Sequence, residues 1–173
     1  MQQLLTKGMD FRLPQYRRAV FLRFYDFHTR YRSHPGCVYY LMPWLAAHFH
    51  WTANDKLWFA FLNGNTQNPV TSLQLYAESQ PDEMVQGEWS RLAWDTDRRY
   101  QKAMFPASLQ RYIQLTGGRE QQAAYFQALC SSADKQENFR RVWAAVRGEF
   151  LGFGRLSAFS YLEYLRIMGL PLE

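Results

Sequence analysis

Hydrophobic positions along the chain recur at three- and four-residue steps, which predicts helices throughout. The clearest stripe lies between residues 15 and 32, and it consists of Tyr16, Val20, Phe21, Phe24, Phe27 and Tyr31. Similar patterns predict helices over 38–49, 52–62, 69–78, 83–94, 106–116, 119–129, 136–150 and 156–168. Alternating strand patterns and internal repeats are not found. We therefore predict an all-α fold, a compact single-domain bundle of about nine or ten helices over residues 15–173, preceded by an N-terminal arm, residues 1–14.

The chain is organised around the stretch LWFAFLNGNTQNPVTS, residues 57–72. Its bulky apolar residues predict a buried helix that stops at Gly64, and a new helix is expected with Asn68 as N-cap and Pro69 at its first position. The loop between them carries uncharged amide and hydroxyl groups, on Asn63, Asn65, Thr66, Gln67 and Asn68. Such groups beside the free N–H groups of a helix start can bind an anion. The alternative is a connection whose amides satisfy one another.

Composition narrows the class of protein. Hydrophobic residues make up 47% of the 173 residues and aromatic residues 17%, which excludes a disordered chain. No apolar run reaches the length of a membrane span, and the N-terminus lacks the hydrophobic region of a signal peptide, so we expect no membrane partner. Cys37 and Cys130 lack the spacing of metal ligands and are expected to be free thiols in a cytoplasmic protein.

Positive charge is concentrated near the N-terminus. The net charge is +5, and residues 1–50 hold seven basic residues against two acidic ones, while the remainder is balanced. Sixteen of the 20 basic residues are arginines, whose planar forks suit phosphate. This bias favours an anionic partner. A genome of high GC content would produce the same preference for arginine.

Two polar clusters lie at predicted helix ends in the first part of the chain. Arg32 and His34 follow the first helix and could clamp a phosphate, and Tyr39 and Tyr40 come soon after and could stack on a base. The helix macrodipole and core packing explain the same residues without a ligand. In the second cluster Asp95 and Asp97 precede Arg98 and Arg99. A carboxylate held beside arginines is suited to orient an ammonium group or accept a proton. An N-cap with surface ion pairs is the alternative.

The third cluster opens the last predicted helix. Arg155 precedes Ser157, which we expect to be the N-cap, and Tyr161 follows one turn later. Arg155 would add charge to an electropositive helix start. We expect the starts at Asn68, Asp95 and Ser157 to converge on one anionic ligand. Walker, Rossmann, HExxH and GxSxG motifs are absent from the sequence, which argues against a nucleotide-dependent kinase and a zinc hydrolase.

Four segments together resemble a known family: FYDFHTRYRSHPGCVYYLMPWL, LWFAFLNGNTQNPVTS, DTDRRY and FGRLSAFSYLEYLRIMGLP. They are similar to the amino acid:DNA transferases of bacteriophage thymidine hypermodification, from about Phe24 to Leu170. In that pathway a kinase converts 5-hydroxymethyluracil in DNA to a pyrophosphate ester, and the transferase displaces pyrophosphate with the amine of an amino acid. The resemblance implies double-stranded modified DNA with a flipped base and a free amino acid as partners, in the cytoplasm of an infected host cell. The thymine pyrophosphorylase-type helical proteins of these pathways, relatives of helical DNA glycosylases, are a related alternative.

Roles for the candidate residues follow from this chemistry. Asp97 or Asp95 would bind or deprotonate the amine, and Arg155 would neutralise the departing pyrophosphate together with Arg32, Arg98 or Arg99. The base would lie against the 63–68 loop and stack on Tyr39, Tyr40 or Tyr161. The DNA backbone would be held by the first helix, through Arg17, Arg18 and Arg30. Magnesium is a possible companion of pyrophosphate, although no carboxylate cluster in the sequence demands a metal. A non-catalytic DNA-binding module and a protein-interaction domain are the remaining alternatives.

Overall fold

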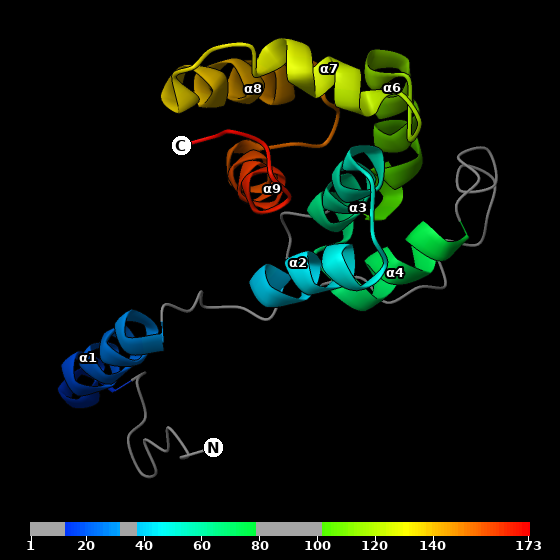
Figure 1. The fold of residues 1–173 in the computed structure, drawn as a ribbon. Helices are drawn as coiled ribbons and strands as arrows, with labels where there is room; N and C mark the ends of the chain where they lie inside the picture. The colour runs from blue at the N-terminus through cyan, green and yellow to red at the C-terminus, as the bar shows by residue number, and fades with distance from the viewer. Residues whose placement is uncertain (1–12, 32–37, 79–101) are drawn as a thin grey trace. The chain divides into compact units, whose positions relative to one another are not determined.

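The computed structural model describes residues 13–31, 38–78 and 102–173 (Figure 1). Its described residues contain eight α-helices, one short 3-10 helix and no strand, which confirms the all-α class. The number of helices is slightly below the predicted nine or ten, and the helix predicted over 83–94 lies outside the described residues. The chain divides into two units, Met1–Tyr40 and Leu41–Glu173. The domain boundary predicted after residue 14 remains a prediction.

The regular structure described in the first unit is mainly helix α1 (Pro14–Tyr31), where the hydrophobic stripe predicted it. Phe21 and Tyr25 lie one turn apart on this helix with their ring centroids 6.4 Å apart, and both are exposed. Helix α2 (Val38–His48) begins at the end of this unit and continues into the second one. Pro43 lies inside α2.

Helix α3 (Ala53–Thr66) is the central element of the second unit. Thr52 and Asp55 form a capping box at its start, because each side chain accepts a hydrogen bond from the backbone N–H of the other residue. The residues from Trp58 to Leu62 have no exposed surface. A helix that is apolar on every side must be surrounded, and α3 packs against α4 (Pro69–Ala77), α7 (Gln122–Leu129) and α9 (Arg155–Ile167).

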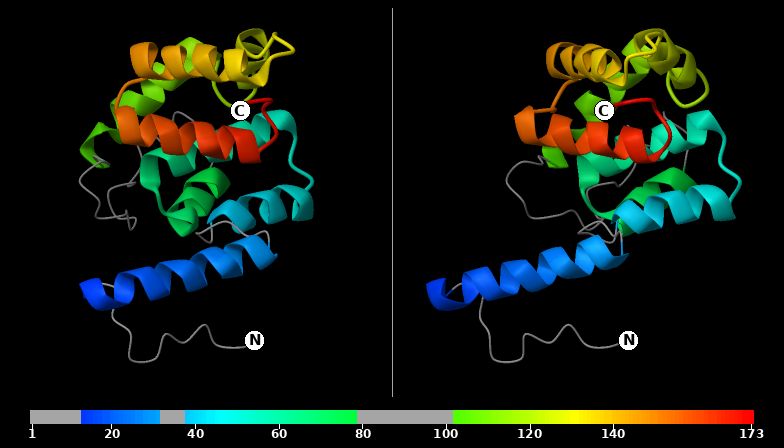
Figure 2. Two further views of the ribbon diagram at one scale, coloured as in Figure 1. Left: turned by 90° about the vertical axis from the view of Figure 1, so that its left-hand side faces the viewer. Right: turned by 60° about the vertical axis from the view of Figure 1, so that its left-hand side comes forward.

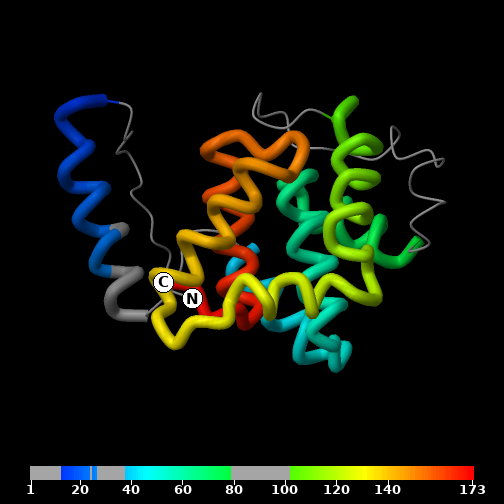
Figure 3. Tube along the Cα trace, turned by 90° about the horizontal axis from the view of Figure 1, so that it is seen from above, coloured from blue at the N-terminus to red at the C-terminus, as the bar shows by residue number. Residues whose placement is uncertain are grey.

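The remaining helices of the second unit cover this centre. The 3-10 helix η2 (Lys102–Met104) leads into α6 (Phe105–Thr116), and α8 (Lys135–Glu149) follows α7. Seen from above, α7 runs across between α6 and α8 (Figure 3). Helix α9 lies side by side with α8 in both views of Figure 2, and its other side faces α3. Aromatic rings fill the centre, for example Phe61 stacked on Tyr112 at 3.8 Å between ring centroids.

The end of α3 and the start of α9 differ from their predicted positions. Helix α3 does not stop at Gly64 but continues to Thr66, and the left-handed turn is made by Gln67, with a φ of 51°. The N-cap of α9 is Gly154 rather than Ser157, because Gly154 is the last residue with extended backbone angles. Ser157 lies inside the first turn, where its hydroxyl donates to the Gly154 carbonyl at 3.1 Å. The N-cap at Asn68 with Pro69 directly after it is confirmed.

Candidate functional site

The polar junction between α3 and α4 is formed by Asn63, Thr66, Gln67, Asn68 and Ser72. Asn68 caps α4, since its Oδ1 accepts from the backbone N–H groups of the next helical turn. The Ser72 hydroxyl donates to Asn63 Oδ1 at 3.1 Å and lies 2.7 Å from the hydroxyl of Thr66. The backbone N–H of Asn68 donates to Thr66 Oγ1 at 3.1 Å. Asn63, Thr66 and Ser72 are buried, so this junction is a turn held by side-chain hydrogen bonds in the interior of the unit.

The polar junction also contacts α9. The Tyr164 hydroxyl donates to Gln67 Oε1 at 2.8 Å, and Gln67 Nε2 donates back to the Asn63 carbonyl at 3.1 Å. The amide of Asn65 donates to the Phe61 carbonyl at 3.0 Å. Most of the amide groups expected to meet a ligand are therefore hydrogen-bonded within the protein. Asn63 Nδ2 differs, because it is buried and has no hydrogen-bond partner among the described residues.

Arg155 lies at the first position of α9 with an exposed side chain. Within the described part of the chain it makes no ion pair or hydrogen bond through its guanidinium group. It lines a groove of about 380 Å³ between α8 and α9, and the other residues lining the groove are Phe139, Arg140, Trp143, Leu156 and Phe159. Of the candidate residues placed by the structure, Arg155 is thus a cation that is available to a ligand.

Tyr161 lies in the aromatic core. Its ring is fully buried and packs 5.0 Å from that of Phe153, measured between centroids. A Cβ atom built on Gly64 would lie 3.1 Å from the Tyr161 ring, so the end of α3 and the middle of α9 are in close contact. The structure therefore brings the polar junction and Tyr161 together, with Tyr161 on the interior side.

The remaining candidates belong to other parts of the chain. Arg17 and Arg18 lie exposed on α1, and Arg30 lies near the end of that helix. Tyr39 is half-buried and Tyr40 exposed in the first turn of α2. Six candidates lie outside the described residues: Arg32, His34, Asp95, Asp97, Arg98 and Arg99. The convergence of three helix starts on one ligand consequently remains a prediction.

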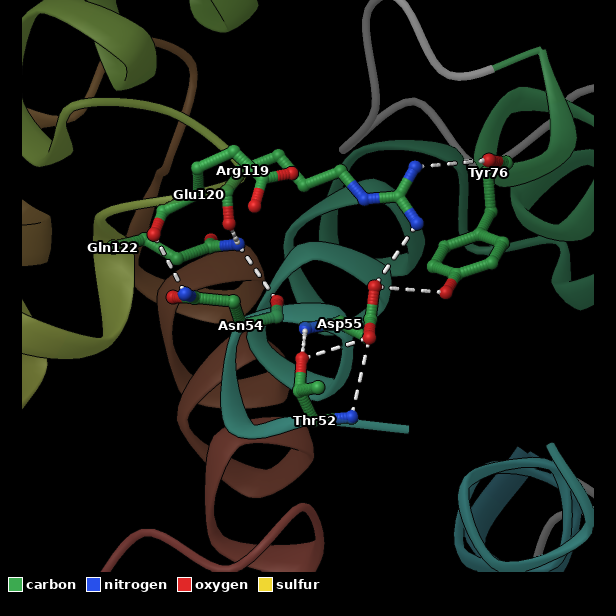
Figure 4. A network of polar contacts seen from close by, with 7 residues as sticks. All are labelled: Thr52, Asn54, Asp55, Tyr76, Arg119, Glu120 and Gln122. Atoms are coloured by element: carbon green, nitrogen blue, oxygen red, sulfur yellow. Dashed lines mark hydrogen bonds and ion pairs between the residues drawn. The ribbon is translucent and has the colours of Figure 1, made fainter. Parts of the chain in front are cut away.

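A network that the sequence did not predict joins the start of α3 to the α6–α7 connection (Figure 4). Arg119 Nη2 contacts Asp55 Oδ1 at 2.9 Å, and its guanidinium carbon lies 4.4 Å above the centroid of the Tyr76 ring. The Tyr76 hydroxyl donates to the same carboxylate oxygen at 3.0 Å, and the Thr52 hydroxyl donates to the other oxygen at 2.7 Å. Both carboxylate oxygens of Asp55 are engaged, so this network cross-links three segments of the fold.

The electrostatics of this network follow from its contacts. Burial alone would raise the pKa of Asp55, but hydrogen bonds from Thr52, Arg119 and Tyr76 outweigh it and lower the pKa. Burial, followed by the neighbouring Asp55 carboxylate, raises the pKa of Tyr76 to about 12. Asp55 is therefore a charged hydrogen-bond acceptor at neutral pH, and Tyr76 is a neutral donor.

Asn54 and Gln122 extend the same network. Asn54 Nδ2 donates to the Glu120 carbonyl at 2.7 Å, and Asn54 Oδ1 accepts from the backbone N–H of Ala123 at 2.8 Å. Gln122 Nε2 donates to the Asn54 carbonyl at 2.8 Å, while its Oε1 accepts from the buried hydroxyl of Tyr112. The capping box of Thr52 and Asp55 is the part of this network that the sequence indicates. The partners of its neighbour Asn54 lie 66 to 69 residues away and carry no local signature.

Other kinds of site find less support in the described residues. These residues contain no group of three or more histidine, cysteine or acidic side chains that could hold a metal ion. None of their helices is both long enough and apolar enough to span a membrane. Cys130 is a free, half-buried thiol, and burial raises its pKa. Near the C-terminus a second hollow of about 370 Å³ is lined by Lys56, Gln127 and the segment 168–171, among others.

Comparison with known proteins identifies the family. The sequence model of the amino acid:DNA transferase family matches residues 36–173. A curated relative from Salmonella phage ViI, named serinyltransferase, is 32% identical over an alignment of 124 residues that covers 65% of this chain and 30% of the relative. The chain thus spans about a third of the length of the curated relative it matches. No solved structure matches the chain. Because the family model covers every helix of the chain from α2 to α9, as the four motif segments predict, the chain belongs to the amino acid:DNA transferase family.

Proposed function

We propose that this chain transfers an amino acid, through its amine, onto 5-pyrophosphoryloxymethyl-uracil in DNA. In this step a C–N bond forms at the exocyclic methylene carbon and the C–O bond to pyrophosphate breaks. The ammonium group must give up a proton to become a nucleophile, and pyrophosphate leaves with the electron pair of the broken bond. The single observation that carries the proposal is the match of the family model to residues 36–173.

Serine is the first amino acid to test as the donor. The phage relative is named for the transfer of that residue, and its 32% identity extends over 65% of this chain. A pocket that takes serine must hold a carboxylate and a small hydroxymethyl side chain. Other small amino acids make similar demands, so the assay includes all of them.

The largest change of charge in the reaction is on the leaving pyrophosphate. Guanidinium groups stabilise such charge best when they are held beside it before the reaction. Arg155 is supported for this role because it is exposed, lies beside aromatic side chains and has no acidic partner in the described residues. Arg32, Arg98 and Arg99 are proposed to assist. Asp97, or Asp95 in its place, is proposed to take the amine proton.

The experiment is a transfer assay on duplex DNA containing 5-pyrophosphoryloxymethyl-uracil, with serine alone and then with pooled amino acids. Digestion to nucleosides and mass spectrometry should show an aminoacyl adduct, and released pyrophosphate should equal it in amount. Asp97→Asn should lower turnover by about 100-fold or more, as expected for loss of a general base. Glu120→Gln, an exposed carboxylate change, should leave turnover unchanged. Parallel reactions with and without Mg²⁺ show whether a metal accompanies pyrophosphate.

Two other outcomes would contradict the proposal. DNA binding without any adduct from any amino acid would favour a non-catalytic DNA-binding module. Consumption of hydroxymethyluracil DNA with formation of the pyrophosphate ester, rather than its loss, would favour the pyrophosphorylase-type enzyme of the same pathway.

A further inference from the structure

The groove between α8 and α9 combines solvent-accessible aromatic side chains with two arginines. Phe139 and Trp143 lie one turn apart on α8, with ring centroids 6.1 Å apart and an interplanar angle of 12°. From α9, Leu156 and Phe159 line the same groove and are 58% and 52% exposed. Its volume of about 380 Å³ is within the range of small-molecule sites.

The arginines give the groove a positive charge. Arg140 and Arg155 line it from opposite helices. Arg140 shares the carboxylate of Glu137 with Arg141, at 3.2 and 3.0 Å, so one acidic group offsets two basic ones. Residues 135–168 hold six basic and three acidic residues, whereas the described residues of the second unit before residue 135 hold equal numbers of the two. Positive charge in the described part of this unit is therefore concentrated on α8 and α9, the two helices that form the groove.

We infer that this groove binds a strand of DNA, with a nucleobase stacked on Phe159 and Trp143 and the flanking phosphates contacted by Arg140 and Arg155. Aromatic side chains give stacking energy with any base, and arginines beside them hold the backbone, which is the usual composition of a surface for unpaired nucleotides. The inference rests on the proposed function, because DNA is the anionic polymer on which that reaction occurs.

Charge argues against a second copy of this chain as the partner that covers the groove, because a chain with net charge +5 would bring like charge to Arg140 and Arg155. A polyanion with aromatic rings complements both features of the groove.

The test measures binding of the full chain to a fluorescein-labelled single-stranded thymidine 12-mer by fluorescence anisotropy over a series of NaCl concentrations. Arg155→Ala should weaken binding and reduce the slope of log affinity against log salt by about 0.7, the value for one phosphate on a single strand. Phe159→Ala and Phe159→Leu should each weaken binding by about five-fold or more while keeping the slope, because they remove stacking and no charge. The exposed position of Phe159 allows both variants to fold.

Arg166→Ala is the matched control. Arg166 is an arginine of the same helix, is 42% exposed, pairs with Glu163 at 3.6 Å and does not line the groove, so this variant should keep both the affinity and the slope of wild type. Wild-type affinity in the Arg155 and Phe159 variants would overturn the inference. A change of oligomeric state in sedimentation for Phe159→Ala, with DNA affinity unchanged, would also overturn it and assign the groove to protein contacts.

The experiments distinguish a failure of the transferase proposal from a failure of the groove proposal. Absence of transfer activity in a wild-type chain that binds DNA, with the groove variants weakened as described, would reject the transferase reaction and keep the groove. Active transfer by the Phe159 variants with an unchanged KM for DNA would reject the groove and keep the transferase reaction, since Phe159 has no role in the proposed chemistry.

Discussion

Gly64 lies where α3 comes closest to the rings of Tyr161 and Phe153. A Cβ atom there would be 3.1 Å from one ring and 3.3 Å from the other, and both rings belong to the packed core. We expect Gly64→Ala to destabilise the protein by about 1 kcal/mol, since the cost of overpacking exceeds the gain in helix propensity. Gly148 in α8 has no atom within 4 Å of such a Cβ, so Gly148→Ala should stabilise by up to about 1 kcal/mol. Urea unfolding of both variants checks the opposite signs, and equal signs would contradict the packing at Gly64.

Asp55 links stability to pH. Its folded-state pKa lies below the ordinary value of 3.8, so its ionised form is favoured by folding. The stabilisation is present above pH 3.8 and is lost as pH falls through the lower folded-state pKa. Asp55→Asn should cost about 1–3 kcal/mol at pH 7, because charged hydrogen bonds from Arg119 and Thr52 are lost.

The measurement for Asp55 is urea unfolding of wild type and variant between about pH 7 and pH 3. The stability difference should be constant from about pH 7 to pH 5 and should shrink below about pH 4. A difference that stays the same down to about pH 3 would show that the charge of Asp55 is not what the variant removes.

At the scale of the helix, substitutions of Asn68 distinguish a purely structural role of the polar junction from a role in substrate binding. Its Oδ1 accepts from Val70 and Thr71 at 3.0 and 3.2 Å, so Asn68→Ala should destabilise by about 1 kcal/mol. Asn68→Asp should keep the cap, because aspartate accepts the same two hydrogen bonds. If Asn68 also meets the anionic substrate, the aspartate variant should fold like wild type and transfer far less. Parallel unfolding and transfer assays distinguish the two cases, and full activity of Asn68→Asp would restrict the residue to capping.

The sequence predicts the helix starts of this protein that are capped by nearby side chains. Thr52, Asp55 and Asn68 act through local side-chain contacts within three residues, which a sequence shows directly. The sequence places the end of α3 at Gly64, but Asn63 and Thr66 find hydrogen-bond partners in Ser72 of the next helix. Asn63 and Thr66 therefore remain part of α3, and the helix continues beyond Gly64. The prediction of Ser157 as an N-cap is wrong for a different reason, since Gly154, three residues earlier, takes the extended conformation that precedes the helix.

The candidate site was predictable to a lesser extent, because its contacts join distant residues. Arg119 reaches Asp55 over 64 positions and Tyr164 reaches Gln67 over 97, and no local pattern marks either pair. The aromatic groove also escaped prediction. Phe139, Trp143 and Phe159 appear in the sequence as ordinary helix residues, and only the pairing of α8 with α9 brings them beside Arg155.

For the molecule as a whole, the distribution of charge predicts a division of DNA contacts between the two units. Helix α1 of the first unit carries Arg17 and Arg18 with exposed side chains, and residues 1–50 hold seven basic residues against two acidic ones. The double variant Arg17→Ala, Arg18→Ala should reduce the slope of log affinity against log salt on duplex DNA by about 0.9 for each phosphate that these side chains neutralise. The melting temperature should stay constant, since exposed arginines contribute little to stability.

The matched control for the Arg17, Arg18 variant is Lys135→Ala, which removes one exposed cation from the second unit. Lys135 Nζ lies 3.8 Å from a carboxylate oxygen of Glu173. Lys135→Ala should leave the salt dependence nearly unchanged, because the charge of Lys135 is already offset. The transfer rate at saturating DNA should also be the same in the Arg17, Arg18 variant as in wild type, since phosphate contacts on α1 increase affinity without touching the reacting atoms. A lowered rate at saturating DNA would indicate that α1 lies close to the reacting base. An unchanged salt slope would instead show that α1 does not contact DNA, and the α8–α9 groove would then be the principal cationic part of the DNA-binding surface.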